Sequence, residues 1–174
     1  RMGIQPNSLL RNNGDGTFLP PSSFSTGNNP YIIEAMDLNN DGFIDVMSAN
    51  QSDQSISVLI NDGFGNFSPR SDYMLGNDVW GITSKDLNGD GYNDIAVAGS
   101  WYANFVVLLN NGDGTFASPS FYNSGQTPLM LQSEDMDGDG DNDIVLVDYN
   151  ASGKVFIHFN NGDGTFTDDR EYAT

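Results

Sequence analysis

A repeat of 49 residues runs along this chain of 174 residues and constrains its fold more than any other feature. An acidic segment recurs at that spacing, and its copies begin at Asp37, Asp86 and Asp135. A second segment, Asn-Asn-Gly-Asp-Gly-Thr-Phe or a degenerate form of it, alternates with the first, and its copies begin at Asn12, Asn61, Asn110 and Asn160. Two motifs that keep one period predict a repeat protein, in which each unit buries its apolar faces by stacking on its neighbours.

Each unit is predicted to form four short β-strands. The second and third strands are nearly continuous apolar runs, which indicates strands covered on both faces. The Asn-Gly-Asp-Gly sequence that follows them is a strong hairpin signal, because Gly and Asn tolerate a positive φ. No segment shows a sustained period of 3.6 residues, so we expect essentially no helix. The predicted strands are 31–36, 46–49, 56–60 and 67–74 in the first complete unit, 80–85, 95–98, 105–109 and 116–122 in the second, and 129–134, 144–147, 155–159 and 166–172 in the third.

Four strands in each unit of this length are typical of a β-propeller blade, so the predicted class is all-β. A β-solenoid is the alternative, but its repeats are usually shorter. The single propeller domain is predicted to contain a half-blade at 1–25 and complete blades at 26–74, 75–123 and 124–174. The half-blade has only the third and fourth strands of a blade, around Leu9–Leu10 and Phe18. Since a closed ring needs about four to eight blades, the remaining ones are expected from the same longer chain or from other copies. The half-blade leaves an unpaired strand edge that invites pairing.

Composition excludes several functions. The net charge is −18, with 24 acidic and 6 basic residues, which excludes nucleic-acid binding and disfavours docking on anionic membranes. No apolar run approaches the ~18 residues of a membrane span, so no membrane insertion is expected. The chain has no cysteine and one histidine, His158, and we find no nucleophile or metal-hydrolase constellation around it, so no enzyme activity is predicted.

The acidic segments predict metal sites. Positions one, three, five and nine of each loop carry side-chain oxygens, and the residue at position seven can add its backbone carbonyl. Hard oxygen donors at alternate positions in a tight loop suit Ca²⁺, which takes six to eight oxygens. The predicted ligands of three calcium ions are Asp37, Asn39, Asp41, Phe43 and Asp45 in the first loop, Asp86, Asn88, Asp90, Tyr92 and Asp94 in the second, and Asp135, Asp137, Asp139, Asp141 and Asp143 in the third.

Other interpretations of these loops are weaker. An EF-hand loop would need Glu at position twelve, where this chain has Ser48, Val97 and Leu146 within a predicted strand. Mg²⁺ usually keeps several waters and avoids cages made of protein alone. Solvated Asx-turns would explain one loop, but three in register would crowd carboxylates that repel each other without a cation. The Asn-Gly-Asp-Gly turns offer too few donors for a metal.

These loops and turns resemble the FG-GAP and VCBS-like repeats of integrin α-subunit propellers and of their bacterial and fungal relatives. The resemblance covers nearly the whole chain. The Phe-Gly signature survives only at Phe64–Gly65 and the Gly-Ala-Pro element is missing, so the chain is closer to the VCBS-like branch. The resemblance implies a propeller of about seven blades, Ca²⁺ between the first and second strands, and an extracellular setting. Some relatives are lectins or adhesins, and others are non-catalytic parts of larger surface proteins.

A ligand is expected on the face opposite the calcium loops, because strand direction alternates within a blade. Aromatic rings beside amide and carboxylate groups suit a glycan or a peptide. The candidate residues are Gln51, Trp101, Tyr102 and Tyr149. Packing of Trp101 and Tyr102 between blades is the alternative. The predicted function is a calcium-stabilised extracellular recognition module, and the alternative is a structural unit that completes a ring or fibre by pairing blade edges.

Overall fold

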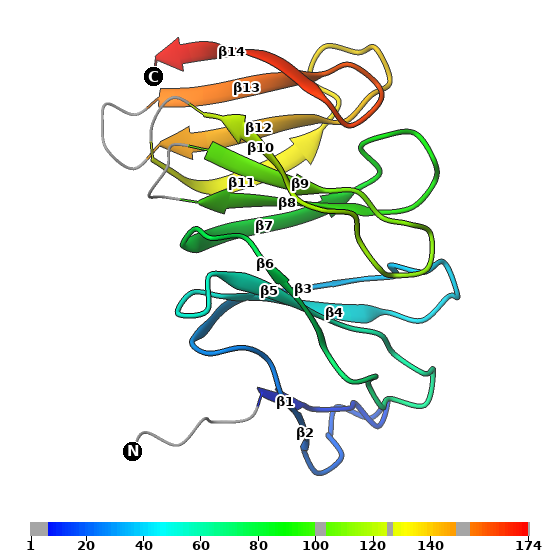
Figure 1. Ribbon diagram of the computed structural model, residues 1–174. Helices are drawn as coiled ribbons and strands as arrows, with labels where there is room; N and C mark the ends of the chain where they lie inside the picture. The colour runs from blue at the N-terminus through cyan, green and yellow to red at the C-terminus, as the bar shows by residue number, and fades with distance from the viewer. Residues whose placement is uncertain (1–6, 100–103, 125–126, 149–153, 174) are drawn as a thin grey trace.

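The computed structural model describes residues 7–99, 104–124, 127–148 and 154–173. This part of the chain contains strands and turns but no helix, in agreement with the sequence. Three sheets have four antiparallel strands each, in the consecutive orders β3-β4-β5-β6, β7-β8-β9-β10 and β11-β12-β13-β14, and a fourth sheet pairs β1 with β2. We refer to the four-stranded sheets as blades 1, 2 and 3. Figure 1 shows these sheets stacked one above another along the chain.

The strand bounds follow the predicted pattern. The half-blade has β1 (Asn7–Leu9) and β2 (Ser22–Phe24). Blade 1 has β3 (Pro30–Met36), β4 (Asp45–Asn50), β5 (Ser55–Leu59) and β6 (Ser71–Met74). Blade 2 has β7 (Val79–Lys85), β8 (Asp94–Gly99), β9 (Asn104–Leu108) and β10 (Ser120–Asn123). Blade 3 has β11 (Pro128–Glu134), β12 (Asp143–Asp148), β13 (Lys154–Asn160) and β14 (Phe166–Ala173).

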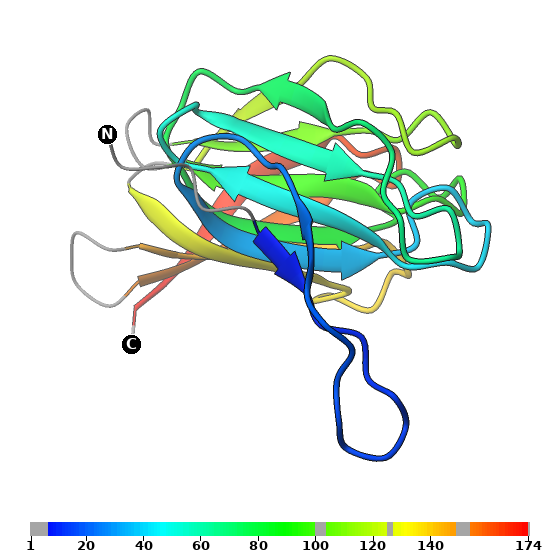
Figure 2. The same ribbon diagram turned by 90° about the horizontal axis from the view of Figure 1, so that it is seen from below.

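The core lies between the blades rather than within them. One apolar cluster joins blades 1 and 2 and includes Met47, Ile56 and Val97. A second cluster joins blades 2 and 3 and includes Phe105 and Leu146. The first strands β3, β7 and β11 lie next to one another, and Figure 2 shows the twist of the stacked sheets from below. A sheet thus buries a face only where a neighbouring blade lies against it, as in a propeller.

The fourth strands of blades 1 and 2 are shorter than the sequence predicts. Phe67 and Phe116 form only isolated bridges, with Asn61 and Asn110, before the strands begin four residues later. Each of those intervals contains a proline, which has no N–H for the ladder and is excluded from regular pairing. Blade 3 has no proline there, and its β14 runs without interruption from Phe166.

The same correction applies to the half-blade. The sequence placed its last strand around Phe18, but Phe18 forms only a bridge with Asn12, and β2 begins at Ser22. Pro20 and Pro21 lie in the interval. Proline therefore sets the start of three of the four outer strands.

His158 and Trp80 both pack against aromatic rings of a neighbouring blade. His158 is 3% exposed, and its ring lies 4.8 Å from the ring of Phe105 in the neighbouring blade. Trp80 on the inner strand β7 is half-buried against Tyr31, with ring centroids 5.3 Å apart. No helix in the described residues is long and apolar enough to cross a membrane.

Candidate functional site

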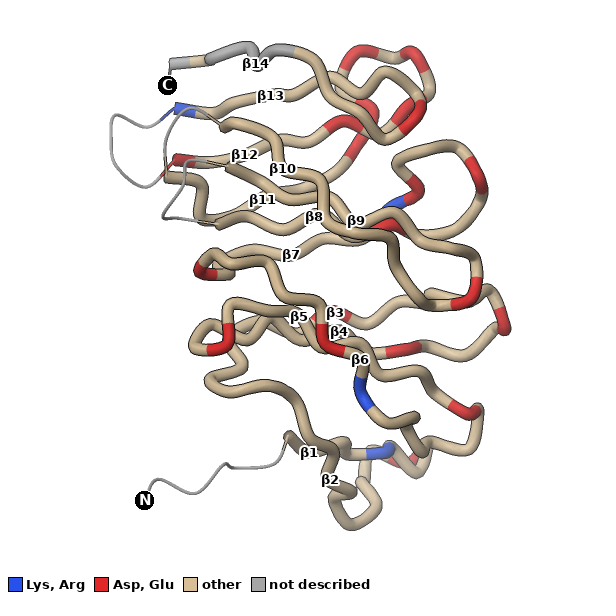
Figure 3. The backbone as a smooth tube through the Cα atoms, in the orientation of Figure 1, with Lys and Arg blue, Asp and Glu red and all other residues tan. Residues whose placement is uncertain are grey.

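The acidic loops and the Asn-Gly-Asp-Gly turns emerge at the same end of the stacked blades. The loops 37–45, 86–94 and 135–143 join the first and second strands of their blades, and the turns join the third and fourth. Figure 3 shows many of the Asp and Glu residues gathered along this end of the sheets. Both motifs therefore lie on one face, which we call the loop face.

The carboxylate at position one of each loop organises the backbone that curls around it. Asp86 accepts N–H hydrogen bonds from Gly89 at 2.8 Å and from Gly91 at 2.9 Å. Asp135 accepts the equivalent bonds from Gly138 and Gly140, at 2.7 and 3.1 Å. Asp37 likewise accepts from Gly42 at 2.9 Å. The sharp turn that would bring the later ligands back toward the first is therefore built into each loop.

The carboxylate at position nine is buried and joins the loop to the turn of the same blade. In blade 2, Asp94 accepts the N–H of Leu87 at 2.9 Å and the N–H of Asn110 at 2.7 Å. The equivalent residues Asp45 and Asp143 make the same pair of bonds. Burial raises the pKa of Asp94 to about 6 and also raises the pKa of Asp45. A neighbouring cation would favour the charged form of these buried carboxylates.

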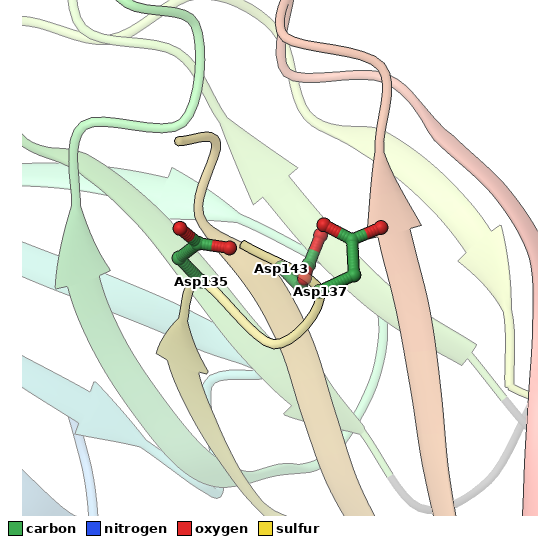
Figure 4. Close-up of side chains that lie close together, drawn as sticks. All are labelled: Asp135, Asp137 and Asp143. Carbon is green, nitrogen blue, oxygen red and sulfur yellow. The ribbon is translucent and has the colours of Figure 1, made fainter. Parts of the chain in front are cut away.

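The third loop brings three carboxylates into one cluster. Oxygens of Asp135, Asp137 and Asp143 all lie within 4.8 Å of one another, and among the described residues this is the one such group of three (Figure 4). Desolvation, and then repulsion by Asp139, Asp143 and Asp135, raises the pKa of Asp137. Three oxygens gathered in this way fit a hard divalent cation, which would relieve the repulsion between them.

The first two loops have an amide where the third has Asp137. Asn39 and Asn88 donate to the position-five carboxylates Asp41 and Asp90, at 2.9 and 3.0 Å. Each of these carboxylates also accepts the N–H of the residue at position seven. The amide thus replaces one carboxylate in these loops and donates a hydrogen bond to another, whereas the third loop has a carboxylate at that position.

The side chains at position seven pack on the neighbouring turn, an arrangement the sequence analysis did not foresee. Phe43 lies against Gly63, Tyr92 against Gly112 and Asp141 against Gly162. A Cβ on Gly63 would lie 2.5 Å from the Phe43 ring, and the φ of this glycine is +78°. The positive φ therefore favours glycine at this point of the turn, where the Phe43 ring occupies the space that a side chain would take. The predicted carbonyl ligands of these three residues stay a prediction.

The aspartates of the Asn-Gly-Asp-Gly turns stabilise the turns in which they lie. Asp113 accepts from the N–H and the hydroxyl of Thr115, at 2.9 and 2.6 Å, and Asp163 bonds Thr165 in the same way. These hydrogen bonds hold the pKa of both carboxyls below its usual range. The geometry agrees with the assignment of these residues to turn chemistry rather than to metal binding.

The sequence analysis missed the role of the first asparagine in each turn. Asn110 donates to the carbonyl of Leu38 in the preceding blade at 2.7 Å and to the carbonyl of Asn93 at 2.9 Å. Asn160 repeats both bonds, to Leu87 at 2.7 Å and to Asn142 at 2.9 Å. The regular recurrence of these asparagines at the start of each turn was the signal that could have revealed them as links between acidic loops of adjacent blades.

On the face opposite the loop face, polar side chains of neighbouring loops bond one another. Gln51 is half-buried and accepts from the side chain of Asn29 at 2.9 Å, while its own N–H donates to the Asn29 carbonyl at 3.0 Å. Asp53 holds Asn28 through two hydrogen bonds of 2.7 and 2.9 Å. The other candidate ligand residues, Trp101, Tyr102 and Tyr149, lie outside the described residues.

A cleft of about 500 Å³ separates the half-blade from blade 1. Serine hydroxyls of β2, the rings of Phe24 and Phe67, and the Arg70 side chain line it. The Arg70 guanidinium is held by the Asp72 carboxylate at 3.0 Å and by the carbonyl of Thr26.

Comparison with known protein families shows to which family the chain belongs. The family model described as FG-GAP-like repeat matches residues 3–48, 37–97 and 86–130. The chain belongs to the FG-GAP-like repeat family. The three overlapping matches cover the half-blade and the first two acidic loops and reach β11. No curated protein matches the chain in sequence.

Two solved structures place this FG-GAP-like protein among propeller-type folds. A lectin from Agrocybe aegerita, described for its specific recognition of non-reducing terminal N-acetylglucosamine, is 26% identical and superposes with a TM-score of 0.66. The match covers 94% of this chain and 45% of the lectin, so the chain spans less than half of that relative's length. The Tc holotoxin pore of Photorhabdus luminescens superposes with a TM-score of 0.50 at 16% identity, over 99% of this chain and 8% of that one.

Proposed function

We propose that the chain is a calcium-stabilised, non-catalytic recognition module of an extracellular propeller, and that it binds glycans. The observation that carries the proposal is the acidic loop repeated in all three blades, with the Asp135, Asp137 and Asp143 oxygens within 4.8 Å of one another. In this proposal three Ca²⁺ ions are held by the loop residues at positions one, three, five and nine and by the carbonyl at position seven. The complete ring has about seven blades.

Calcium would act on stability rather than on chemistry. Each loop holds a buried carboxylate at position nine, and Asp94 illustrates the cost of that burial through its raised pKa. A bound ion supports the charged form of these carboxylates and reduces repulsion on a chain of net charge −18. Linkage gives about 2.7 kcal/mol of stabilisation per site when free calcium is one hundred times the dissociation constant. Affinities of ~10⁻⁴ to 10⁻³ M suit extracellular calcium.

Glycan recognition is supported by the similarity to the Agrocybe aegerita lectin, over 94% of this chain. The polar groups of Gln51, Asn28 and Asp53 on the face opposite the calcium loops are suited to hydroxyl-rich ligands. Hydrogen bonds between neighbouring loops hold these groups in place, which lowers the entropy cost of binding.

The calcium part of the proposal is tested by isothermal titration of the chain with CaCl₂ after treatment with a chelator. We expect three ions per chain and a higher midpoint of thermal unfolding. Asp135→Asn should remove one ion, because Asp135 is the carboxylate around which its loop curls. Asp113→Asn is the matched control, since Asp113 belongs to a turn on the same face, and it should leave three ions. Absence of a calcium effect on either measurement would contradict the proposal.

The recognition part is tested on a glycan array that includes glycans ending in N-acetylglucosamine, with calcium and with a chelator. Binding is expected in calcium and should fall in the chelator. Gln51→Ala should reduce it on the face proposed to bind, and Asp113→Asn on the loop face should not. No bound glycan in calcium, by a chain that does bind three ions, would reject the recognition role and leave the calcium role standing.

A structural or assembly unit is the second candidate function. Tyr31 and Ile33 on β3 are exposed, and a cavity of about 180 Å³ lies between them and Asn7 of the half-blade. A missing inner hairpin of the half-blade would fill this space. Mass measurement in calcium distinguishes the two candidates, because assembly through this edge predicts oligomers and a monomer contradicts it.

A further inference from the structure

Four asparagines in the chain precede a glycine, and one of them lies in an acidic loop. Asn13, Asn111 and Asn161 occupy the second position of their turns, whereas Asn88 occupies position three of the second loop. In an Asn-Gly pair the glycine nitrogen can attack the side-chain carbonyl carbon of the asparagine, because glycine has no Cβ to hinder the approach. The asparagine then loses its amide, and the four sites can be compared within one chain.

The acceptor of the glycine N–H separates the second loop from the turns. The Gly89 N–H donates to the carboxylate of Asp86 at 2.8 Å. In the turns, the equivalent N–H donates to the amide oxygen of the asparagine two residues earlier, at 2.7 Å from Gly14, 2.9 Å from Gly112 and 3.0 Å from Gly162. A carboxylate at this distance can take the proton of an attacking nitrogen, whereas a neutral amide oxygen is too weak a base. Asp86 is thus placed as a general base for the Gly89 nitrogen.

Space around the glycine also distinguishes the second loop. Ring closure turns the peptide between the asparagine and the glycine, so the backbone at the glycine has to move. Beyond its chain neighbours, a Cβ built on Gly89 would meet nothing nearer than the Gly162 carbonyl oxygen at 3.9 Å. A Cβ on Gly112 would lie 3.2 Å from the Tyr92 ring, and one on Gly162 would lie 2.6 Å from the Asp141 carboxylate. Side chains at position seven therefore cover these two turn glycines but leave Gly89 open.

The third loop already contains the residue that loss of the amide would produce. Asp137 stands where the second loop has Asn88, and a glycine follows both residues. The Gly138 N–H donates to Asp135 at 2.7 Å, which repeats the bond of the second loop. An aspartate at position 88 is therefore compatible with the backbone of the loop.

We propose that Asn88 is a site of self-modification, at which Asp86 is the base that lets the Gly89 nitrogen displace the amide. The Gly89 nitrogen bonds to Cγ of Asn88, and the side-chain nitrogen leaves as ammonia with the proton that Asp86 took from Gly89. A five-membered succinimide ring remains. Solvent water then opens this ring, its hydroxyl going to the carbon and its proton to the nitrogen. Cleavage at Cγ leaves an aspartate in an unchanged backbone, and cleavage at the backbone carbonyl carbon leaves an isoaspartate.

The aspartate product gives the second loop the acidic set of the third. Carboxylates then occupy positions one, three, five and nine, as they do at Asp135, Asp137, Asp139 and Asp143. Calcium should suppress the reaction, a step that rests on the proposed calcium function. Asp86 is a predicted ligand, and a cation in contact with a carboxylate lowers its basicity. The modification therefore affects chains that lack calcium.

The test incubates the chain in a chelator and, separately, in excess CaCl₂. Peptide mass spectrometry follows each asparagine through the mass that deamidation adds. In the chelator, Asn88 should deamidate at least fivefold faster than Asn111 and Asn161. Asn39 is the control at the same loop position, and it should be slowest because Asn40 rather than glycine follows it. CaCl₂ should slow the reaction of Asn88 at least fivefold and leave that of Asn111 within twofold.

Asp86→Asn tests the base. This variant keeps a hydrogen-bond acceptor for the Gly89 N–H but removes the carboxylate, so Asn88 should deamidate at least fivefold more slowly in the chelator. A loop that had merely loosened would change the rate in the opposite direction, because a mobile Asn-Gly pair reaches the attacking geometry more easily. Asp135→Asn makes the same change in the third loop. It is the matched control and should leave the rate at Asn88 unaltered.

The outcomes separate this inference from the proposed calcium function. The modification site is overturned if Asn88 reacts no faster than Asn111 in the chelator, or if Asp86→Asn does not lower its rate. Protection by calcium is overturned if CaCl₂ fails to slow Asn88 in a chain that titrates with three ions. Fast reaction of Asn88 in a chain that binds no ion would confirm the modification site and contradict the calcium function alone.

Discussion

The asparagine that opens each turn allows a graded test of how the blades are joined. The Asn160 side chain makes four hydrogen bonds: it donates to Leu87 and Asn142 and accepts from Gly162 and Gly164. Replacing it with alanine leaves four backbone groups without this partner, in a place where Asn160 itself is 5% exposed. At about 1 kcal/mol for each net hydrogen bond, Asn160→Ala should cost about 4 kcal/mol of unfolding free energy.

The other copies of the residue serve as a matched series. Asn110 makes three such bonds, Asn61 makes two, and Asn12 in the exposed turn of the half-blade makes one, to the N–H of Gly14. The same arithmetic gives about 3 and about 2 kcal/mol for Asn110→Ala and Asn61→Ala. Asn12→Ala should cost less than about 1 kcal/mol, because water replaces an exposed bond.

Urea unfolding at a fixed calcium concentration, followed by tryptophan fluorescence, measures the series. The decisive comparison is Asn160→Ala against Asn12→Ala, since both change the same residue of the same turn motif. Equal losses for the two variants, or an order unrelated to the number of bonds, would refute the claim that the side-chain hydrogen bonds of these asparagines stabilise the stacked blades.

Three further predictions follow from the loops and the sheet faces. Asp137→Asn should weaken calcium binding at the third loop, and the reciprocal Asn88→Asp should strengthen calcium binding at the second loop. Titration with CaCl₂ measures both affinities, and unchanged affinities would contradict the role of loop charge. Without calcium, the folded chain holds a proton on Asp94 up to about pH 6, whereas the unfolded chain releases it near 3.8. The contribution of Asp94 to stability should therefore be largest below about pH 4 and fall as the pH rises through 6, and the calcium-induced rise in the unfolding midpoint should grow from pH 5 to pH 7. Finally, Ala98→Asp should cost more than about 4 kcal/mol by burying an unpaired charge, while Val147→Asp at the equivalent exposed position should cost less than about 1 kcal/mol, both by urea unfolding.

The sequence by itself determined the repeat, the strand content and the place of the acidic loops. These features depend on local chemistry: alternating oxygen donors, glycine at the turns, and apolar runs long enough for one strand. The period then identified the blades without knowledge of any contact. The positions of Asp135, Asp137 and Asp143 around one centre also follow from loop spacing, because the glycine at position six fixes the return of the chain.

Only the tertiary structure decided how the blades hold one another. Asn110 reaches a carbonyl of Leu38, 72 residues away, and no local pattern specifies that partner. The shortened β6 and β10 also required the structure, since the proline in each interval competes with an otherwise favourable strand sequence. The exposure of Met130 and Tyr172 could not be deduced from residue type, because their equivalents in the other blades are covered. Burial depends on which sheet lies opposite, and that is a property of the assembled stack rather than of any single repeat.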